Sequence, residues 1–173
     1  MITFNTNRLH FRPYHEADFQ HIFRLQSDEE IMRYIRPATN DVAIVLERTQ
    51  LWLKYAAENP GYGVWTLESL EDHAFIGYTV VRHVEFKPGA EIEVGYTLAK
   101  ESWGKGYATE ATEGIMQYAI KTLGAPALVA YTDETNSASN RVLEKCGFQR
   151  KGIERMYDAD CLRWENPLTF AAS

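Results

Sequence analysis

Hydrophobic and polar residues alternate near the N-terminus and then take up the spacing of helices. Residues 8–14 alternate apolar and polar side chains, which predicts a first strand. Pro13 favours the end or the edge of that strand. One face of a following helix is predicted to carry Phe19, Ile22, Phe23 and Gln26. Ser27 and Asp28 interrupt this pattern and can cap a short helical turn over residues 29–34.

A longer helix is predicted over residues 42–58, with Asn40 or Asp41 as its N-cap. Its apolar positions have helical spacing, namely Val42, Val45, Leu46, Thr49, Leu53, Ala56 and Ala57. An Asn-Pro-Gly sequence at 59–61 ends this helix. Three strands are then expected at residues 62–67, 74–83 and 92–98, separated by an acidic turn and a Pro-Gly turn.

The second half of the chain alternates helices and strands. A helix is predicted over residues 107–123, since Ala108, Ala111, Ile115, Ala119 and Ile120 have helical spacing. Further elements are expected at 128–131 (strand), 136–146 (helix), 148–157 (strand) and 162–170 (strand). We therefore predict a mixed α/β (α+β) fold, a largely antiparallel sheet of about seven strands with about four helices. No repeat or linker interrupts residues 1–173, which we expect to form a single domain.

Charge and cysteine usage narrow the classes of function. The 18 Lys and Arg residues are outnumbered by 24 Asp and Glu, the net charge is −6, and the longest cationic run is Arg150-Lys151, so direct nucleic-acid binding is not expected. We find no signal peptide and no run long enough to span a membrane. Cys146 and Cys161 have no metal or redox spacing, which favours free thiols in a reducing cytoplasm. The five histidines are scattered, so no metal site is predicted.

A glycine-containing loop joins the strand at 92–98 to the helix that begins near Tyr107. Gly104 and Gly106 stand where the chain must turn from strand to helix. The first N–H groups of the helix have no partner within it and carry the positive end of its dipole, which suits a phosphate group. Taken alone, two glycines are more typical of a plain tight turn than of a phosphate site.

A second motif favours the phosphate site over the plain turn. Residues 136–148, Asn-Ser-Ala-Ser-Asn-Arg-Val-Leu-Glu-Lys-Cys-Gly-Phe, would by themselves be a capped amphipathic helix ended by a glycine. Together with residues 103–111, they make the chain resemble the GNAT superfamily of acetyl-CoA-dependent N-acetyltransferases. The chain looks most like the RimJ/RimL-type branch, whose members include enzymes that acetylate ribosomal-protein N-termini. Other segments share this resemblance: residues 6–13 with Asp18, 31–34 and 93–96.

The resemblance implies acetyl-CoA as co-substrate and a sheet splayed where it binds. The pantetheine arm would be held by Asn136 and by the backbone of Tyr96, Thr97 and Leu98. The pyrophosphate would be held by amides in the segment Trp103, Gly104, Lys105, Gly106, Tyr107, Ala108 and Thr109. Two positions depart from the family pattern. Glu101 replaces a frequent Gln or Arg, and Leu143 replaces a frequent Tyr, which excludes a phenolic acid at position 143.

Acetyl transfer by direct attack needs a free amine, a donor to the oxyanion and a proton for the departing thiolate. We expect Ser139 to serve the thiolate, a backbone N–H near Tyr96 to face the carbonyl oxygen, and Glu93 to accept the amine proton. Ser139 could equally be a helix cap and Glu93 a solvated strand carboxylate. Asp158 is a rival base, although a turn residue is the simpler interpretation. Cys146 lies on an apolar face, so we expect it to be buried rather than nucleophilic.

Several alternatives stay open at the level of sequence. The acceptor is expected to be a protein N-terminal amine, a small amine is the second candidate, and a non-catalytic acyl-CoA-binding module is the third. A dinucleotide fold is disfavoured, since the loop lacks a third glycine. The acceptor pocket should involve residues 19–34 and the chain after Phe148, with aromatics Tyr34, Trp52, Trp65, Tyr157 and Trp164 either lining it or in the core. The acidic balance favours a cationic acceptor, and either a monomer or a homodimer is compatible with the sequence.

Overall fold

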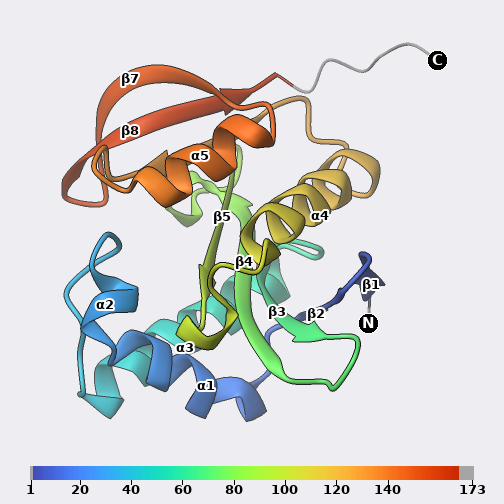
Figure 1. Cartoon of the computed structure of the whole chain (residues 1–173), viewed down its shortest axis with the longest axis vertical. Coiled ribbons are helices and arrows are strands. Elements are labelled where there is room, and N and C mark those ends of the chain that lie inside the picture. Colours follow the sequence, from blue (N-terminus) through green and yellow to red (C-terminus); the bar gives the residue numbers. More distant parts are fainter. Residues whose placement is uncertain (1, 168–173) are drawn as a thin grey trace.

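The computed structural model describes residues 2–167 and confirms the predicted fold class (Figure 1). The strands are β1 (Phe4–Asn5), β2 (Leu9–Pro13), β3 (Gly63–Ser69), β4 (Phe75–His83), β5 (Ile92–Leu98), β6 (Leu128–Thr132), β7 (Gln149–Met156) and β8 (Ala159–Asn166). The helices are α1 (Phe19–Gln26), α2 (Glu29–Met32), α3 (Val42–Glu58), α4 (Tyr107–Lys121) and α5 (Ser137–Lys145).

The described residues form eight strands and five α-helices, against about seven and about four predicted, and the bounds of the last strand differ. The additional strand β1 has two residues and pairs Phe4 with Phe11 of β2. The last strand was expected at 162–170 but begins earlier, at Ala159, and ends at Asn166. Only Tyr157 and Asp158 turn the chain between β7 and β8, both with left-handed backbone angles (φ 52° and 62°). The predicted strand residues 168–170 lie outside the described part of the chain.

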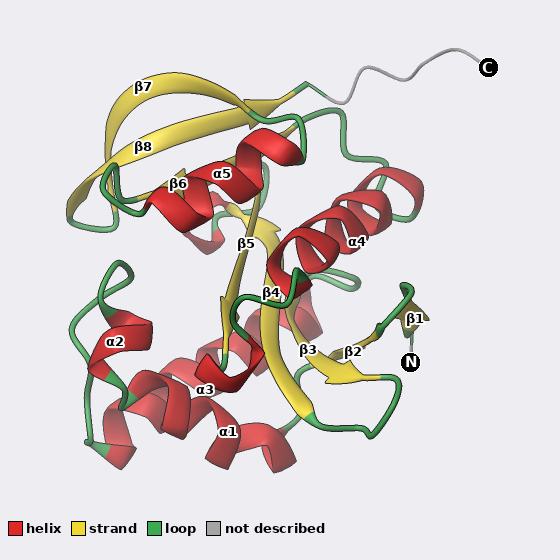
Figure 2. Cartoon of the chain, viewed as in Figure 1, coloured by secondary structure: helices red, strands yellow, loops and turns green. Residues whose placement is uncertain are grey.

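One sheet contains all eight strands, in the order β1-β2-β3-β4-β5-β6-β8-β7. Every neighbouring pair is antiparallel except β5 and β6, which are parallel and share a single paired position, Glu93 with Val129. Beyond Glu93 the two strands part, and Figure 2 shows β5 running away from the sheet half that contains β6, β7 and β8. The C-terminal half of β5 therefore keeps β4 as its partner on one edge, and no strand within residues 2–167 pairs with the other edge.

Helices cover both faces of the sheet, and the alternation of side chains sorts the core into two clusters. The larger cluster joins α4 and α5 to the strands, with Val81, Val94, Ile115 and Leu143 among its buried members. The smaller cluster joins α1 and α3 to the opposite face, with Ile22, Val45, Tyr78 and Val80 buried. Figure 1 shows α1 and α3 at one end of the molecule and α4 and α5 at the other.

Helix α3 buries a narrower stripe than its apolar spacing indicates. Val45 and Thr49 are buried, as expected from the pattern, and Tyr55 joins them with 6% exposure. Val42 and Leu46 belong to the same sequence pattern but are 53% and 44% exposed. These two positions fall beyond the region where α1 and the sheet cover the helix, because only one side of α3 meets other elements.

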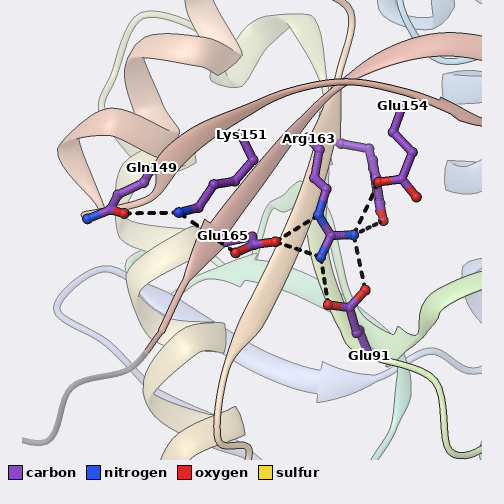
Figure 3. A network of polar contacts seen from close by, with 7 residues as sticks. Glu91, Gln149, Lys151, Glu154, Arg163 and Glu165 are labelled. Atoms are coloured by element: carbon purple, nitrogen blue, oxygen red, sulfur yellow. Dashed lines mark hydrogen bonds and ion pairs between the residues drawn. The ribbon is translucent and has the colours of Figure 1, made fainter.

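Two ion-pair networks fix the ends of strands. Arg12 of β2 donates to both carboxylate oxygens of Asp18 at 2.7 Å, and Thr66 of β3 donates to the same carboxylate at 3.0 Å. Arg163 of β8 lies among three carboxylates, Glu91, Glu154 and Glu165 (Figure 3). The second network ties the segment before β5 to β7 and β8, so it holds the sheet together close to the point where β5 and β6 part.

Candidate active site

A cavity of about 550 Å³ opens where β5 and β6 part. Tyr78, Arg82 and Gly95 line it from the face of the sheet that carries α1 and α3. Val94 and Tyr96 line it from the opposite face, together with Ile115 of α4. Since both faces contribute, the cavity runs through the sheet, and two molecules that enter from opposite faces could meet at β5.

The glycine loop leads from β5 to the start of α4. Gly104 and Gly106 have φ angles of 71° and 80°, which are left-handed values that glycine adopts without a steric penalty. Gly106 is the N-cap of α4 and makes no side-chain cap, so the first N–H groups of the helix have no cap from a side chain at this position. A side chain built at Gly104 would meet nothing within 4 Å. Glycine at position 104 therefore permits the left-handed backbone angle and leaves space for a ligand to approach the backbone. Tight packing does not require it there.

Side chains from distant segments hold this loop in place. Arg8 donates to the carbonyl oxygen of Lys105 at 2.8 Å and to Glu110 of α4 at 2.7 Å. The indole N–H of Trp103 donates to the carbonyl oxygen of Leu98 at 3.1 Å, which joins the loop to the end of β5. Glu101, the residue that departs from the family pattern, pairs with Arg24 of α1 at 2.7 Å. Glu101 thus anchors the loop to α1 in this chain.

Three polar side chains meet between α5 and β5. Asn136 caps α5 by accepting from the Ser139 backbone N–H at 3.2 Å, and its amide group donates to Ser139 Oγ at 3.1 Å. Ser139 Oγ also shares a hydrogen bond of 3.0 Å with the phenol oxygen of Tyr96. Burial raises the pKa of Tyr96, and this outweighs the hydrogen bond from Ser139, which lowers it. The Tyr96 phenol is therefore protonated throughout the physiological pH range.

The sequence analysis missed the side chain of Tyr96 and considered only its backbone. Position 143 is indeed Leu, and Leu143 is buried in the core with 4% exposure. A phenol nevertheless lies beside Ser139, supplied by β5 instead of α5. The alternation of side chains along β5 could have indicated this, since Val94 and Tyr96 share a face.

Glu93 lies at the last paired position before the strands part and is 6% exposed. Arg82 of β4 contacts its Oε2 atom at 3.3 Å, and the Tyr157 hydroxyl donates to the same oxygen. The other oxygen, Oε1, makes no hydrogen bond to a residue within 2–167. It is also not completely buried, since Thr79 Oγ1 is the one completely buried polar side-chain atom without a partner in this part of the chain. Glu93 therefore lines the cavity with one carboxylate oxygen held in place and the other without a hydrogen-bond partner among the described residues.

Arg82 and Tyr157 are further residues that sequence reasoning did not assign. Burial alone would lower the pKa of the Arg82 guanidinium, but the charge of Glu93 raises it overall. Burial is the main cause that raises the pKa of Tyr157. Arg82 stays charged and Tyr157 stays a neutral donor, so both hold the Glu93 carboxylate. No spacing in the sequence links these three residues, which come from three different strands or turns.

The predicted site residues divide into three groups. Those that line the cavity are Glu93, Tyr96, Thr97 and Ser139. Those that adjoin it without lining it are Leu98, the loop segment 103–109 and Asn136. Asp158 lies at the tip of the β7–β8 turn, is exposed and is not part of the lining, whereas its neighbours Tyr157 and Asp160 are.

The predicted aromatic residues divide between the cavity and the core. Tyr34, Trp52 and Tyr157 line the cavity, whereas Trp65 and Trp164 are 2% and 1% exposed core residues. Cys146 is half-buried, and burial raises the pKa of its thiol to about 11. A thiol with such a pKa is protonated at neutral pH and is a poor nucleophile.

Two further findings concern the part of the chain that the structure describes. Residues 2–167 contain no group of three or more His, Cys, Asp or Glu side chains placed to hold a metal ion. Among the same residues, no helix combines the length and the apolar character needed to cross a membrane.

Comparisons with known proteins agree with this geometry. The chain is 29% identical over 153 residues to the N-acetyltransferase YoaA of Bacillus subtilis, covering 88% of this chain and 85% of that protein. An acetyltransferase structure from Agrobacterium tumefaciens superposes with a TM-score of 0.83 at 25% identity, covering 96% and 94% of the two chains.

Two more distant structures share the fold and differ in their acceptors. A spermidine N-acetyltransferase from Vibrio cholerae, solved with CoA and spermine, has a TM-score of 0.77 at 20% identity over 93% of this chain and 96% of that one. A ribosomal-protein-S5-alanine acetyltransferase from Vibrio fischeri has the same TM-score at 17% identity over 96% and 97%. The family model for the acetyltransferase (GNAT) domain matches residues 8–149, and the chain therefore belongs to the GNAT family of N-acetyltransferases.

Proposed function

We propose that this chain, as one domain over residues 1–173, transfers an acetyl group from acetyl-CoA to a primary amine by direct attack. The observation that carries this proposal is the cavity that runs through the sheet at β5. One face offers a glycine loop and a helix N-terminus, and the other offers a buried carboxylate with one free oxygen. The amine and the thioester could thus meet without a covalent intermediate on the enzyme.

The residues near β5 and α4 fit acetyl-CoA, the co-substrate of the GNAT family. The backbone of Tyr96, Thr97 and Leu98 would hold the pantetheine arm through the edge of β5 that has no strand partner. The amides of residues 103–109 would hold the pyrophosphate, since Gly104 and Gly106 permit the tight approach. Asn136 remains a predicted pantetheine contact, next to its role as the cap of α5. Acetyl-CoA would supply the activated acyl group and a thiolate leaving group.

Ser139 and Tyr96 are proposed to supply the proton that the departing sulfur needs. Asn136 donates to Ser139 Oγ, and Tyr96 can donate to it as well, which leaves the Ser139 proton free to point into the cavity. The raised pKa of Tyr96 keeps its phenol protonated and able to restore that proton. This arrangement would replace the tyrosine that position 143 lacks.

Glu93 is proposed to accept the proton of the attacking amine, directly or through one water molecule. An α-amine has a pKa of about 8, so roughly a tenth is unprotonated at neutral pH and a nearby base is useful. Arg82 and Tyr157 orient the carboxylate through Oε2 and leave Oε1 for this task. Asp158 remains the rival carboxylate, although the turn places it outside the lining of the cavity.

For the acceptor, we propose a protein N-terminal amine, as in the RimJ/RimL-like branch. The cavity reaches the surface between the segment after α2, the helix α3 and the β7–β8 turn, with exposed Ile35 and Leu51 among its lining residues. Such an opening suits an extended peptide. The second candidate, a small amine, is supported by the shared fold of the spermidine enzyme. A polyamine is disfavoured here, since Arg36 and Arg48 line the same opening. The free thiols of Cys146 and Cys161 accord with the cytoplasmic location that we propose.

The first experiment measures CoA thiol release from acetyl-CoA with two pools of amines. One pool holds short peptides with free Ala, Ser or Met N-termini, and the other holds polyamines, amino acids and aminoglycosides. We expect turnover with the peptide pool. Turnover only with small amines would make the acceptor a metabolite. Acetyl-CoA binding without thiol release from any amine would favour the non-catalytic module.

Two carboxylate variants then decide the base. We expect Glu93→Gln to lower kcat by about a hundredfold or more, which is the usual contribution of a general base. Asp158→Asn is the matched control, because asparagine tolerates the left-handed backbone of that turn. Melting temperature and acetyl-CoA affinity are measured for both, since Glu93 also neutralises Arg82. A large loss with Asp158→Asn and little loss with Glu93→Gln would reverse the assignment.

A further inference from the structure

The acceptor side of the cavity carries two arginines that have no ion-pair partner. The cavity is lined by four cations, Arg36, Arg48, Lys54 and Arg82, and by four carboxylates, Glu58, Glu93, Asp133 and Asp160. Lys54 pairs with Glu58 at 4.0 Å, and Arg82 pairs with Glu93 at 3.3 Å. Within residues 2–167, neither Arg36 nor Arg48 has a carboxylate within ion-pair distance. This contrasts with the chain as a whole, which carries a net charge of −6.

Arg48 is placed rigidly, and its position does not depend on an ion pair. It is half-buried on α3, and its Nη1 atom donates to Oε1 of Gln26 at 2.6 Å. Gln26 itself is 3% exposed at the end of α1. The neutral amide orients the guanidinium and leaves its charge uncompensated, so the other N–H groups of Arg48 can serve a ligand.

Arg36 adds a second guanidinium at the mouth of the cavity. It follows α2, and its backbone N–H donates to the Met32 carbonyl oxygen at 3.2 Å, whereas its guanidinium makes no hydrogen bond or ion pair with another described residue. Loss of water contact lowers its pKa, and the positive charges of Arg48 and Arg82 lower it further. These positive charges repel one another. An anion bound between them would relieve this repulsion.

Resting on the proposed function, we propose that the acceptor carries a carboxylate close to its reacting amine and that Arg36 and Arg48 bind this carboxylate. A guanidinium matches the planar geometry of a carboxylate through paired N–H donors. The amine would then point toward Glu93 and β5, deeper in the same cavity. In a peptide acceptor, the carboxylate would be an Asp or Glu side chain near the N-terminus; in a small acceptor, it would be an α-carboxylate.

This proposal reverses the expectation from composition that the acceptor is cationic. Three acidic residues outside the lining of the cavity, Glu91, Glu154 and Glu165, surround Arg163 instead (Figure 3). The segment after α2 and the tip of the β7–β8 turn both border the cavity and lie on the same side of the molecule in Figure 1. At Arg36 and Arg48, a ligand meets positive charge, although the net charge of the whole chain is −6.

The test compares acetylation of matched peptides that begin with a free alanine and carry Asp, Asn or Lys at the next two positions. We expect kcat/KM to be about tenfold higher for the Asp peptide than for the Lys peptide, as for one charged hydrogen bond. Arg36→Gln should remove this preference by raising KM for the Asp peptide, with KM for acetyl-CoA unchanged. Alanine and alaninamide form a second pair that distinguishes an α-carboxylate from a side-chain carboxylate.

Arg33→Gln is the matched control, because it removes one positive charge close to α2 from a side chain that lies over the Tyr34 ring and not in the lining. It should preserve the preference. At position 48 we use Arg48→Lys and not Arg48→Gln. Lysine keeps the positive charge, whereas glutamine would also disturb the packing of α1 on α3. An equal or higher rate with the Lys peptide, or an effect of Arg36→Gln on KM for acetyl-CoA, would overturn the proposal.

Binding of the same peptides is also measured by calorimetry, which requires no turnover. Binding that favours Asp and depends on Arg36, without thiol release, would retain the anion site and reject the proposed reaction. Turnover without charge preference would retain the reaction and reject the anion site. The two proposals can therefore fail separately.

Discussion

The two sides of the cavity are built from different kinds of groups. The side toward α4 offers mainly backbone, through the unpaired edge of β5 and the amides that follow Gly104 and Gly106. The side toward α2 and α3 offers side chains, among them Arg36, Arg48 and Glu93. Backbone groups are the same in every sequence, whereas side chains change with each substitution. The side toward α4 therefore suits a co-substrate that is the same in all members of the family. On the side toward α2 and α3, substitutions of side chains can change the specificity for the acceptor.

The largest effect on kcat is expected at Ser139, which lies where the two sides of the cavity meet. Ser139→Ala removes the hydroxyl that joins Tyr96 to the cavity, and we expect kcat to fall by about a hundredfold while acetyl-CoA affinity changes little. Steady-state kinetics with acetyl-CoA titration separate the two. Tyr118→Phe is the control, since this phenol is also buried but donates to the carbonyl of Gly61 away from the cavity. Unchanged kcat in Ser139→Ala would remove Ser139 from the proposed mechanism.

A smaller effect is expected when the backbone side is altered. Gly106→Ala places a side chain at a φ of 80°, which costs about 1–2 kcal/mol and shifts the amides that we assign to the pyrophosphate. We expect about a tenfold rise in KM for acetyl-CoA, with KM for the acceptor unchanged.

Gly89→Ala is the matched control for that variant. Its φ of 90° carries a similar backbone cost, and its added side chain would meet nothing within 4 Å. It should lower the melting temperature to a similar extent without changing KM for acetyl-CoA. An equal change in KM in both variants would mean that Gly106 acts only through stability.

The smallest expected effect is in the dependence of kcat/KM on pH, which tests whether Tyr96 is the source of the proton. An acid must be protonated to act, and a raised pKa extends the range in which Tyr96 is protonated. We expect kcat/KM to rise as the amine loses its proton and then to stay level up to about pH 10, the ordinary pKa of tyrosine. A rate that declines from about pH 9 would contradict a burial-raised phenol as the proton source.

The sequence by itself determined the fold class and the order of the elements. These features depend on local patterns: the alternation along strands, the spacing of helices, and two glycines at a strand-to-helix turn. Gly104 and Gly106 have the left-handed angles that the loop requires, and Asn136 caps α5 as its position in the motif indicated. Such features need no knowledge of distant residues.

Only the tertiary structure decided which side chains meet at the cavity. The Tyr96 phenol meets Ser139 across 43 positions of sequence, and Tyr157 meets Glu93 across 64. The parting of β5 from β6 and the lack of carboxylate partners for Arg36 and Arg48 likewise depend on which strands and helices become neighbours. Net charge sums over the whole chain, but a ligand responds to the charges within a few ångströms of it. For this reason, the net charge of the chain favoured a cationic acceptor, whereas from Arg36 and Arg48 we infer a carboxylate on the acceptor.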